Sequence, residues 1–500
     1  MSIERAPPAR KTFLFLQGHP SSFARELAKA LERRGHRALR VNFCLGDALF
    51  GMGQAAVSYR GSFEDWPTFL ADLIHREGIT DVLYYGDRRP YHLEAAKVAD
   101  ALGVRSYVYE FGYLRPDWLT LERGQMTSGS HFPVDPDLIR EIGAKFDRPD
   151  LTARYSSPVA IELFHEIVYN LSSYFLHVLY PRYRADRYYN PILEYLTGIP
   201  RQLRLSAYAR RANAIVDGLL RDKTGYFLYP LQLQCDYQIR HHSPFRHQSD
   251  AIDFVLRSFA AHAPERDHIV FKCHPLDNGG EGWPDHIART ATRLGIASRV
   301  HYIDGGNLEL LLKTARGCVL INSTVGMHAI SLGCPLNVLG TAVFDIPTLS
   351  DPRPLDDFWT APLKPDAPLA DALLRAMAGT IQVKGSFFSW EGKAHAIRVF
   401  VERLENETVN GSGAFISPPP RLAGEGNAAA HDRPDGAATA FAGCGGAGSS
   451  ISVEGAVGAE DASCHGDETE REQQDVQAEH QPKGSLRIAR CPVMKPSVQE

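Results

Sequence analysis

Short apolar segments alternate with amphipathic segments over two separate stretches of the chain, residues 12–109 and 225–339. In the first stretch, the strand-like residues 12–16 precede residues 22–34, in which apolar side chains recur at helical spacing. Strands that alternate with helices of roughly ten residues form βαβ units, and such units build parallel sheets. The alternation therefore predicts two doubly wound, Rossmann-like α/β domains.

The two stretches divide the chain into four parts. We predict an N-terminal Rossmann-like domain over residues 1–149 and a C-terminal Rossmann-like domain over residues 223–409. A helical insertion over residues 150–222 separates them, because strand signals fade there while Tyr, Leu and Arg recur at helical spacing, with breaks near its prolines. Residues 410–500 are poor in apolar side chains and predict a disordered, non-catalytic tail.

Two Rossmann-like domains that face each other across a cleft form the GT-B architecture of glycosyltransferases. Nucleotide-sugar epimerases share the same order of elements, so the fold alone does not settle the function. Two further segments, residues 369–381 and 394–404, are predicted helices that close the second domain and cross back to the first.

Charge and cysteine usage exclude several classes of protein. The net charge of -5 argues against general nucleic-acid binding. The eight cysteines are spread singly, without the spacing of a zinc site, so we expect no metal and reduced thiols in the cytoplasm. No run approaches eighteen apolar residues, which argues against a membrane span and leaves attachment to a membrane surface open. The arginines and tyrosines of residues 182–211 suit either anionic lipid headgroups or a solvated face.

Two strand ends in the second domain carry a candidate phosphate site. Lys272 and His274 share one side of a strand that ends before Pro275, and residues 322–326 (Asn-Ser-Thr-Val-Gly) join another strand to a helix. Ligands of doubly wound sheets bind at the carboxyl ends of strands, and a helix start offers N–H groups to phosphate. His274 and Lys272 would then neutralise a departing phosphate by charge-assisted hydrogen bonds. A histidine that caps its strand and an ordinary helix N-cap remain the alternatives.

Glu110 is the candidate catalytic carboxylate. It ends the predicted strand of residues 106–110, where it would face the cleft between the domains as a general base or nucleophile. Asp117 is a second carboxylate nearby. The alternative for Glu110 is a surface salt bridge with Arg115, which would contribute little.

Further polar strand ends are candidates for binding the acceptor or the sugar. The loop of residues 17–22 follows the first strand but lacks the G-x-G-x-x-G pattern, so a dinucleotide is not indicated. Residues 86–92 suit a sugar or an acceptor carboxylate, and the alternating polar residues 232–238 form either a strand face or a loop that closes over a sugar. The predicted residues are Gln17, Gly18, His19, Asp87, Arg88, Arg115, Gln232 and Asp236.

Between residues 13 and 388 these motifs, in order, resemble those of the KpsS/LipB family of capsular polysaccharide proteins, long labelled export proteins. The resemblance is carried by residues 17–20, 40–43 with 46–47, 59–61 with 66–67, 86–92, 110–118, 230–245, 272–277, 322–326 and 385–388.

The resemblance implies a β-Kdo glycosyltransferase of the GT-B type, without a cofactor. Such an enzyme moves Kdo from CMP-Kdo to a lyso-phosphatidylglycerol anchor at the cytoplasmic face of the inner membrane, and so starts the capsule linker. The resemblance further implies that His274, Pro275, Ser323 and Thr324 hold CMP, with Lys272, Asn322 and Gly326 beside them. Other capsule enzymes and an ABC export complex are the implied partners.

The resemblance also bears on the catalytic residue. Many relatives carry two acidic residues before the glycine that is Gly112 here, and Phe111 occupies the second of these positions, which leaves Glu110. A non-enzymatic export factor that docks on a transporter, and a nucleotide-sugar epimerase on the same fold, are the alternative functions.

Overall fold

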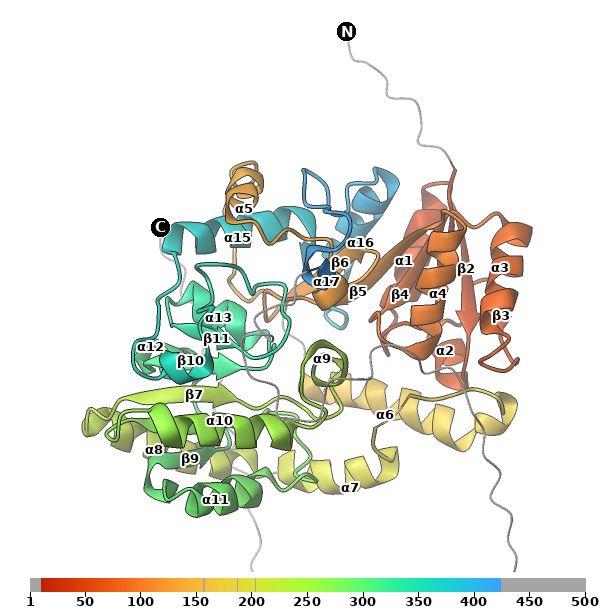
Figure 1. Cartoon of the computed structure of the whole chain (residues 1–500). Helices are drawn as coiled ribbons and strands as arrows, with labels where there is room; N and C mark the ends of the chain where they lie inside the picture. Colours follow the sequence, from red (N-terminus) through yellow and green to blue (C-terminus); the bar gives the residue numbers. More distant parts are fainter. Residues whose placement is uncertain (1–9, 156–157, 187, 203, 424–500) are drawn as a thin grey trace, which may run out of the picture. The chain divides into compact units, whose positions relative to one another are not determined.

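The computed structural model describes residues 10–155, 158–186, 188–202 and 204–423 (Figure 1). Its first sheet has seven strands in the order β12-β6-β5-β4-β1-β2-β3. Five of them are parallel neighbours, and in the central strand β1 the side chains of Phe13 and Leu14 are completely buried, whereas the edge strand β3 is largely exposed. These five strands are β1 (Thr12–Phe15), β2 (Arg37–Asn42), β3 (Ala56–Ser58), β4 (Asp81–Tyr85) and β5 (Arg105–Phe111).

The second sheet repeats the same strand order. Its strands pair in parallel in the order β11-β10-β7-β8-β9, so both sheets follow the 3-2-1-4-5 order of a Rossmann fold. The two predicted doubly wound sheets are confirmed, and each has a switch point where the strand order reverses, β1/β4 and β7/β10. The strands are β7 (Tyr226–Pro230), β8 (His268–Lys272), β9 (Val300–Ile303), β10 (Gly317–Leu320) and β11 (Leu336–Val338).

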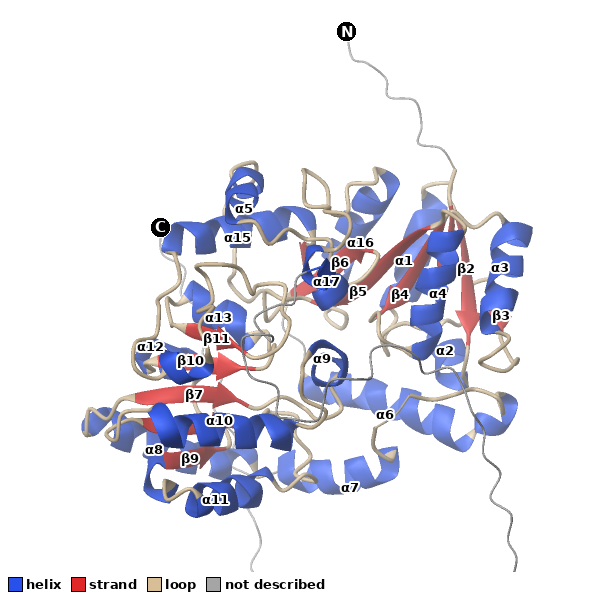
Figure 2. Cartoon of the chain, in the orientation of Figure 1, coloured by secondary structure: helices blue, strands red, loops and turns tan. Residues whose placement is uncertain are grey.

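Helices link the strands of each sheet (Figure 2). In the first half these are α1 (Phe23–Arg33), α2 (Leu45–Phe50), α3 (Trp66–Glu77) and α4 (Pro90–Ala101), and in the second α10 (Gln248–His262), α11 (Trp283–Arg293), α12 (Leu308–Thr314) and α13 (Val325–Ser331). The sequence explains their ends: α3 stops at Gly78, which adopts a left-handed conformation (φ 61°), and α4 starts with a proline in its first turn.

The region between the sheets is helical, as predicted. It contains α6 (Val159–Phe175), the short η2 (His177–Leu179), α7 (Pro191–Gln202) and α8 (Leu205–Arg221). The predicted break near Pro200 is wrong, because α7 continues through this position and ends at Gln202. Among the helices of the described residues, none combines the length and the apolar character that crossing a bilayer requires.

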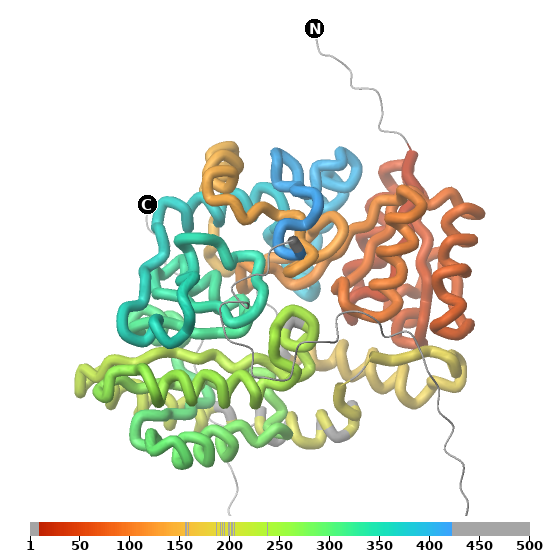
Figure 3. Tube along the Cα trace, in the orientation of Figure 1, coloured from red at the N-terminus to blue at the C-terminus, as the bar shows by residue number. Residues whose placement is uncertain are grey.

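The chain returns from the second sheet to the first (Figure 3). The two predicted closing helices are present as α15 (Ala367–Thr380) and α16 (Trp390–Glu405). Between them, β12 (Gln382–Lys384) pairs antiparallel with β6 (Trp118–Arg123), and α16 packs against α1. Phe387 and Phe400 share an apolar cluster with Phe13 and Phe23, so residues 382–405 complete the core beside the first sheet.

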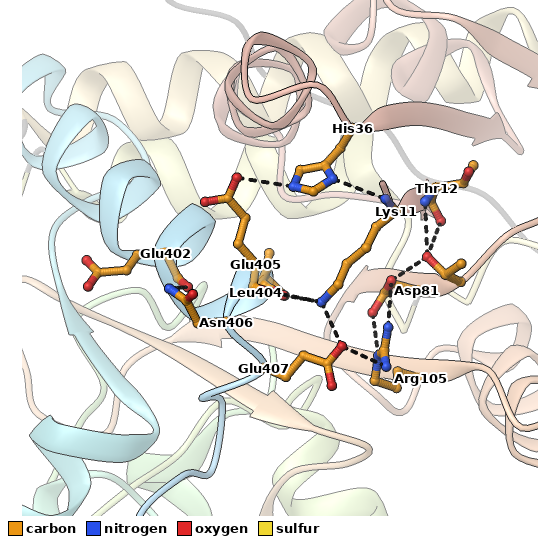
Figure 4. A network of polar contacts seen from close by, with 11 residues as sticks. Lys11, Thr12, His36, Asp81, Arg105, Glu402, Leu404, Glu405, Asn406 and Glu407 are labelled. Atoms are coloured by element: carbon orange, nitrogen blue, oxygen red, sulfur yellow. Dashed lines mark hydrogen bonds and ion pairs between the residues drawn. The ribbon is translucent and has the colours of Figure 1, made fainter. Parts of the chain in front are cut away.

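A network of polar contacts fixes the end of α16 beside β1 and β2; we call it the terminal clasp (Figure 4). The backbone N–H of Lys11 donates to Nδ1 of His36 (3.1 Å), and Nε2 of His36 lies 3.1 Å from Oε1 of Glu405. Arg34 pairs with the same carboxylate (2.8 Å), and the ammonium of Lys11 donates to the carbonyl of Leu404 (2.8 Å).

Residues 410–423 are folded, so the predicted start of a disordered tail at residue 410 is wrong. Ala414 is buried, and Oδ1 of Asn410 accepts a hydrogen bond from the backbone N–H of Arg123 (2.9 Å). The guanidinium of Arg421 donates to the carbonyls of Phe132 and Val343, at 2.6 Å each. The remainder of the predicted tail, residues 424–500, lies outside the described residues.

Candidate active site

Two neighbouring cavities contain most of the predicted site residues. The first is lined by Glu110, Arg115, Gln232, Asp236, His274, Asn322, Ser323 and Thr324, together with residues not predicted from the sequence, such as Tyr113 and Phe344. The second is lined by His19, Asp87, Arg88, Glu110 and Asp236, together with Tyr85, Arg89, Glu166, Tyr169 and Tyr237. Glu110, Phe111 and Asp236 line both cavities, so the two cavities meet at the end of β5.

The first cavity lies at the switch point of the second sheet. Gln232 follows β7 and Asn322 follows β10, and their side chains join the two strand ends: the Gln232 amide donates to Oδ1 of Asn322 (3.0 Å), while the backbone N–H of Asn322 donates to Oε1 of Gln232 (3.2 Å). Ser323 and Thr324 come next in the chain. Thr324 is the N-cap of α13 but makes no side-chain capping bond, so its hydroxyl is not used by the helix.

His274 lines the first cavity as an uncharged side chain. Its Nδ1 accepts a hydrogen bond from the backbone N–H of Leu276 (3.1 Å), which leaves Nε2 to carry the proton. Burial, assisted by the positive charges of Lys272 and Arg115, lowers the pKa of His274 to about 4. His274 can therefore donate one hydrogen bond at neutral pH. It does not carry the positive charge that we predicted would help to neutralise a departing phosphate.

Three predicted donor-site residues lie away from the lining of both cavities. Lys272 is 8% exposed, and burial lowers the pKa of its ammonium while Cys273 and Asp304 favour the charged form. Pro275 follows His274 without lining either cavity. Gly326 permits close packing, because a Cβ at this position would lie 2.2 Å from the ring of Phe344, which does line the first cavity.

Arg115 supplies the positive charge that His274 lacks. Its guanidinium lies over the ring of Phe111, 4.8 Å from the ring centroid. Among the described residues no carboxylate oxygen lies within 4.0 Å of it. The salt bridge considered between Arg115 and Glu110 is therefore not formed, although each charge still influences the pKa of the other group. Phe111, which stands where many relatives carry a second acidic residue, thus holds the Arg115 guanidinium at the cavity wall by a cation–π contact.

The carboxylate of Glu110 accepts no hydrogen bond and forms no ion pair with any described residue. Burial raises its pKa to about 8; the negative charges of Asp236 and Asp87 add to the shift, and Arg115 and Arg89 oppose it. A carboxyl group whose pKa lies near neutral pH in a cavity is suited to general base catalysis. The other candidate, Asp117, instead pairs with Lys384 (2.6 Å).

The second cavity lies at the switch point of the first sheet, where β1 and β4 end. Of the residues predicted to bind the acceptor or the sugar, His19, Asp87 and Arg88 line this cavity. Gln17 and Gly18 do not: the Gln17 amide donates to the hydroxyls of Tyr169 (2.7 Å) and Tyr183 (2.9 Å), and so holds the helical region against the first sheet.

Arg88 connects the walls of the two cavities. Its guanidinium donates to Nε2 of His242 (3.1 Å) and to the hydroxyl of Ser128 (3.2 Å), and the carbonyl of His242 accepts from the Asn322 amide (3.1 Å). A chain of hydrogen bonds thus runs from the end of β4 to the end of β10. These hydrogen bonds hold the switch points of the two sheets in a fixed position relative to each other.

Sequence reasoning missed two groups of lining residues. Tyr85 directly precedes the predicted segment 86–92, which contains Arg89, so the proximity of Tyr85 to the site was visible in the sequence although its orientation was not. Glu166 and Tyr169 come from α6. No local signal marks them, because long-range packing of α6 brings them to the first sheet.

Comparison with known proteins gives one family. A family model described as capsule polysaccharide biosynthesis protein matches residues 80–388. The capsule polysaccharide export protein KpsS of Escherichia coli is 32% identical over 361 residues, which cover 72% of this chain and 92% of that protein. The capsule polysaccharide modification protein LipB of Neisseria meningitidis serogroup A is 30% identical over 402 residues, 78% of this chain and 94% of that protein.

Likeness to solved structures is much weaker. The β-Kdo 2,7 transferase of Thermosulfurimonas dismutans KpsC shares 16% identity at a TM-score of 0.38, over 79% of this chain and 99% of that one. A putative UDP-N-acetylglucosamine 2-epimerase from Listeria monocytogenes shares 11% at a TM-score of 0.27, over 82% and 99%. At these scores the solved structures do not separate a transferase from an epimerase.

Proposed function

Because the chain belongs to the capsule polysaccharide biosynthesis family, we propose that it is a glycosyltransferase that moves Kdo from CMP-Kdo to lyso-phosphatidylglycerol. The observation that carries the proposal is the position of Glu110. Its unpaired carboxyl group, with a pKa of about 8, lies where the two cavities meet. A base in this position can act on an acceptor held in the second cavity while a donor occupies the first.

The first cavity supplies the groups that a departing CMP needs. The hydroxyls of Ser323 and Thr324 and the Nε2–H of His274 would hydrogen-bond to the phosphate oxygens, and Arg115 would add a positive charge. Negative charge on this phosphate grows as the bond between the phosphate oxygen and the anomeric carbon of Kdo breaks. Donors placed beforehand around that oxygen therefore stabilise the transition state more than the bound substrate.

Glu110 would remove the proton of the acceptor hydroxyl. The hydroxyl oxygen forms the new bond to the anomeric carbon, the CMP phosphate leaves with the electron pair of the broken bond, and the hydroxyl proton passes to the Glu110 carboxylate. General base catalysis of this kind contributes about 10²- to 10⁴-fold to the rate.

The surface of the helical region supports peripheral attachment to the inner membrane. Ten of the seventeen large apolar side chains that are exposed in the described residues lie between Ile161 and Leu196, among them Phe175 and Val178 at 60% and 66% exposure. Arg182 and Arg184 are exposed on the same stretch. Apolar side chains beside arginines suit the interface of an anionic membrane, where a lipid acceptor would be met.

Transfer by the purified full chain tests the proposal. With CMP-Kdo and lyso-phosphatidylglycerol, mass spectrometry should detect Kdo-modified lipid for the wild type and at least about 100-fold less for Glu110→Gln. His274→Ala should slow transfer, and Arg398→Gln, an exposed residue of α16, should not. A wild-type protein that makes no product, or equal product from Glu110→Gln, would contradict the proposal.

The same assay separates the alternative functions. An epimerase would convert a nucleotide sugar without the lipid, whereas a transferase consumes CMP-Kdo in proportion to product. A non-enzymatic export factor would leave CMP-Kdo intact, and capsule would still form in cells that carry Glu110→Gln together with His274→Ala.

A further inference from the structure

Arg89 lines the second cavity without a partner for its charge. No described residue accepts a hydrogen bond from its guanidinium, and no carboxylate of a described residue lies within ion-pair distance of it. The guanidinium lies over the ring of Tyr85, 5.6 Å from the ring centroid. The preceding Arg88 is different, because hydrogen bonds to His242 and Ser128 occupy its guanidinium. A partly buried arginine without an anion is the arrangement expected of a site whose anion arrives with the ligand.

Two other polar groups of the same cavity wall are also without partners. His19 is 6% exposed, and its Nδ1 has no hydrogen-bond partner among the described residues. The hydroxyl of Tyr85 likewise makes no hydrogen bond within the described part of the chain. Buried polar atoms are nearly always paired in folded proteins, so the unpaired Nδ1 of His19 beside a cavity indicates a ligand. Tyr85 is only partly buried, and its hydroxyl is available as a further hydrogen-bonding group.

The start of α4 adds a fourth favourable element. Arg89 is the N-cap residue of this twelve-residue helix, makes no side-chain capping bond, and is followed by a proline. The positive end of the helix dipole therefore lies at the same wall of the cavity as the Arg89 guanidinium. The helix start and the Arg89 guanidinium together give this wall a positive potential. His19 adds an uncharged imidazole, because burial and the charge of Arg89 lower its pKa to about 3.

We infer that the wall formed by His19, Tyr85 and Arg89 binds a phosphodiester group of the acceptor and thereby places the acceptor hydroxyl at Glu110. The inference rests on the proposed function, which puts the acceptor in the second cavity. It names the part of the acceptor that is recognised and the residue, Arg89, that recognises it.

The charges of the cavity favour a phosphodiester over other anions. Asp87, Glu110, Glu166 and Asp236 line the same space, so a dianionic phosphomonoester would meet more repulsion than a phosphodiester with its single charge. The donors come from three separate elements, the loop after β1, the end of β4 and the start of α4. Such a spread suits the oxygens of a tetrahedral group better than those of a planar carboxylate.

The affinity of the protein for acceptor-like lipids, measured in the absence of CMP-Kdo, tests this anion site. By calorimetry, wild-type protein should bind a short-chain lyso-phosphatidylglycerol at least about tenfold more tightly than the neutral monoacylglycerol of the same chain length. Arg89→Gln should abolish this preference, Arg89→Lys should retain part of it, and the exposed control Arg398→Gln should retain all of it. Affinity for CMP should be unchanged in Arg89→Gln, which verifies that the first cavity is intact.

Two further ligands, glycerophosphoglycerol and inorganic phosphate, separate this site from the proposed function. If these bind in an Arg89-dependent manner while the lipid does not, the anion site stands and the lipid acceptor is wrong. If Arg89→Gln keeps the full preference for the charged lipid, or if wild type binds the charged and neutral lipids equally, the inference is overturned even where transfer of Kdo is observed.

Discussion

Glu110 occupies surroundings that disfavour its charged form. Burial and the neighbouring Asp236 and Asp87 raise the pKa of its carboxyl group to about 8, and no described residue pairs with it. The stability cost of such a group grows as pH rises from the unfolded pKa to the folded pKa, and it persists in full above the folded pKa. Such a cost is tolerated at functional sites, where the same environment tunes the group for its chemistry.

We predict that Glu110→Gln stabilises the protein while it strongly slows transfer. The unfolded carboxyl group ionises near its ordinary pKa of 4.5 and the folded one near 8, so the wild-type free energy of unfolding falls as pH rises between these values. Glutamine does not ionise, and the variant should be more stable by about 4 kcal/mol near pH 8 and by about 1 kcal/mol near pH 5. Urea denaturation at both pH values measures the difference; a variant less stable than wild type at pH 8 would refute the argument.

The returning C-terminal elements secure the first sheet from outside its own stretch of sequence. β12 adds a strand, α16 packs on α1, and the terminal clasp holds the end of α16 against β1 and β2. Glu405 is the centre of the clasp, because its buried carboxylate meets both His36 and Arg34. Burial acts to raise the pKa of Glu405, but the hydrogen bonds and charges of Arg34 and His36 outweigh it and the pKa is lowered.

Breaking the clasp should destabilise the chain without altering the site. Glu405→Gln removes a buried charge partner and should lower the free energy of unfolding by about 2 kcal/mol at neutral pH. Because the folded pKa of Glu405 lies below its ordinary value, this contribution is present above that value and is lost as pH falls through the folded pKa. Glu402→Gln, an exposed position of the same helix, is the matched control; equal stability of both variants would show that the clasp contributes nothing.

Across the whole molecule, the features that depend on local sequence pattern could be predicted, whereas those that depend on long-range packing or burial could not. The two Rossmann-like sheets and their polar strand ends follow from local alternation of apolar and amphipathic segments, and both were predicted. The strand β12 spans only Gln382–Lys384, too short to form a pattern, and Glu166 and Tyr169 reach the second cavity through packing of α6. The loss of charge on His274 depends on burial, which motif spacing does not report.

The exposed apolar surface of α6, η2 and α7 predicts how the whole chain meets a membrane. Phe175→Glu with Val178→Glu should weaken binding to vesicles that contain phosphatidylglycerol by at least about tenfold, since both side chains would otherwise enter the interface. Leu363→Glu changes an apolar side chain of similar exposure (51%) elsewhere on the molecule. Co-sedimentation measures binding to the vesicles. If the Leu363→Glu variant loses as much binding as the variant with Phe175→Glu and Val178→Glu, the apolar surface of α6, η2 and α7 is not the membrane-binding surface.

The pH dependence of transfer tests the role of Glu110 most directly. The carboxylate must be ionised to accept the proton of the acceptor hydroxyl, so kcat/KM for the wild type should rise with pH and level off above an apparent pKa near 8. The residual activity of Glu110→Gln should lack this rise. A wild-type profile that is flat through this range, or a Glu110→Gln variant with the same pH-dependent rise, would contradict the assignment of Glu110 as the base shared by the two cavities.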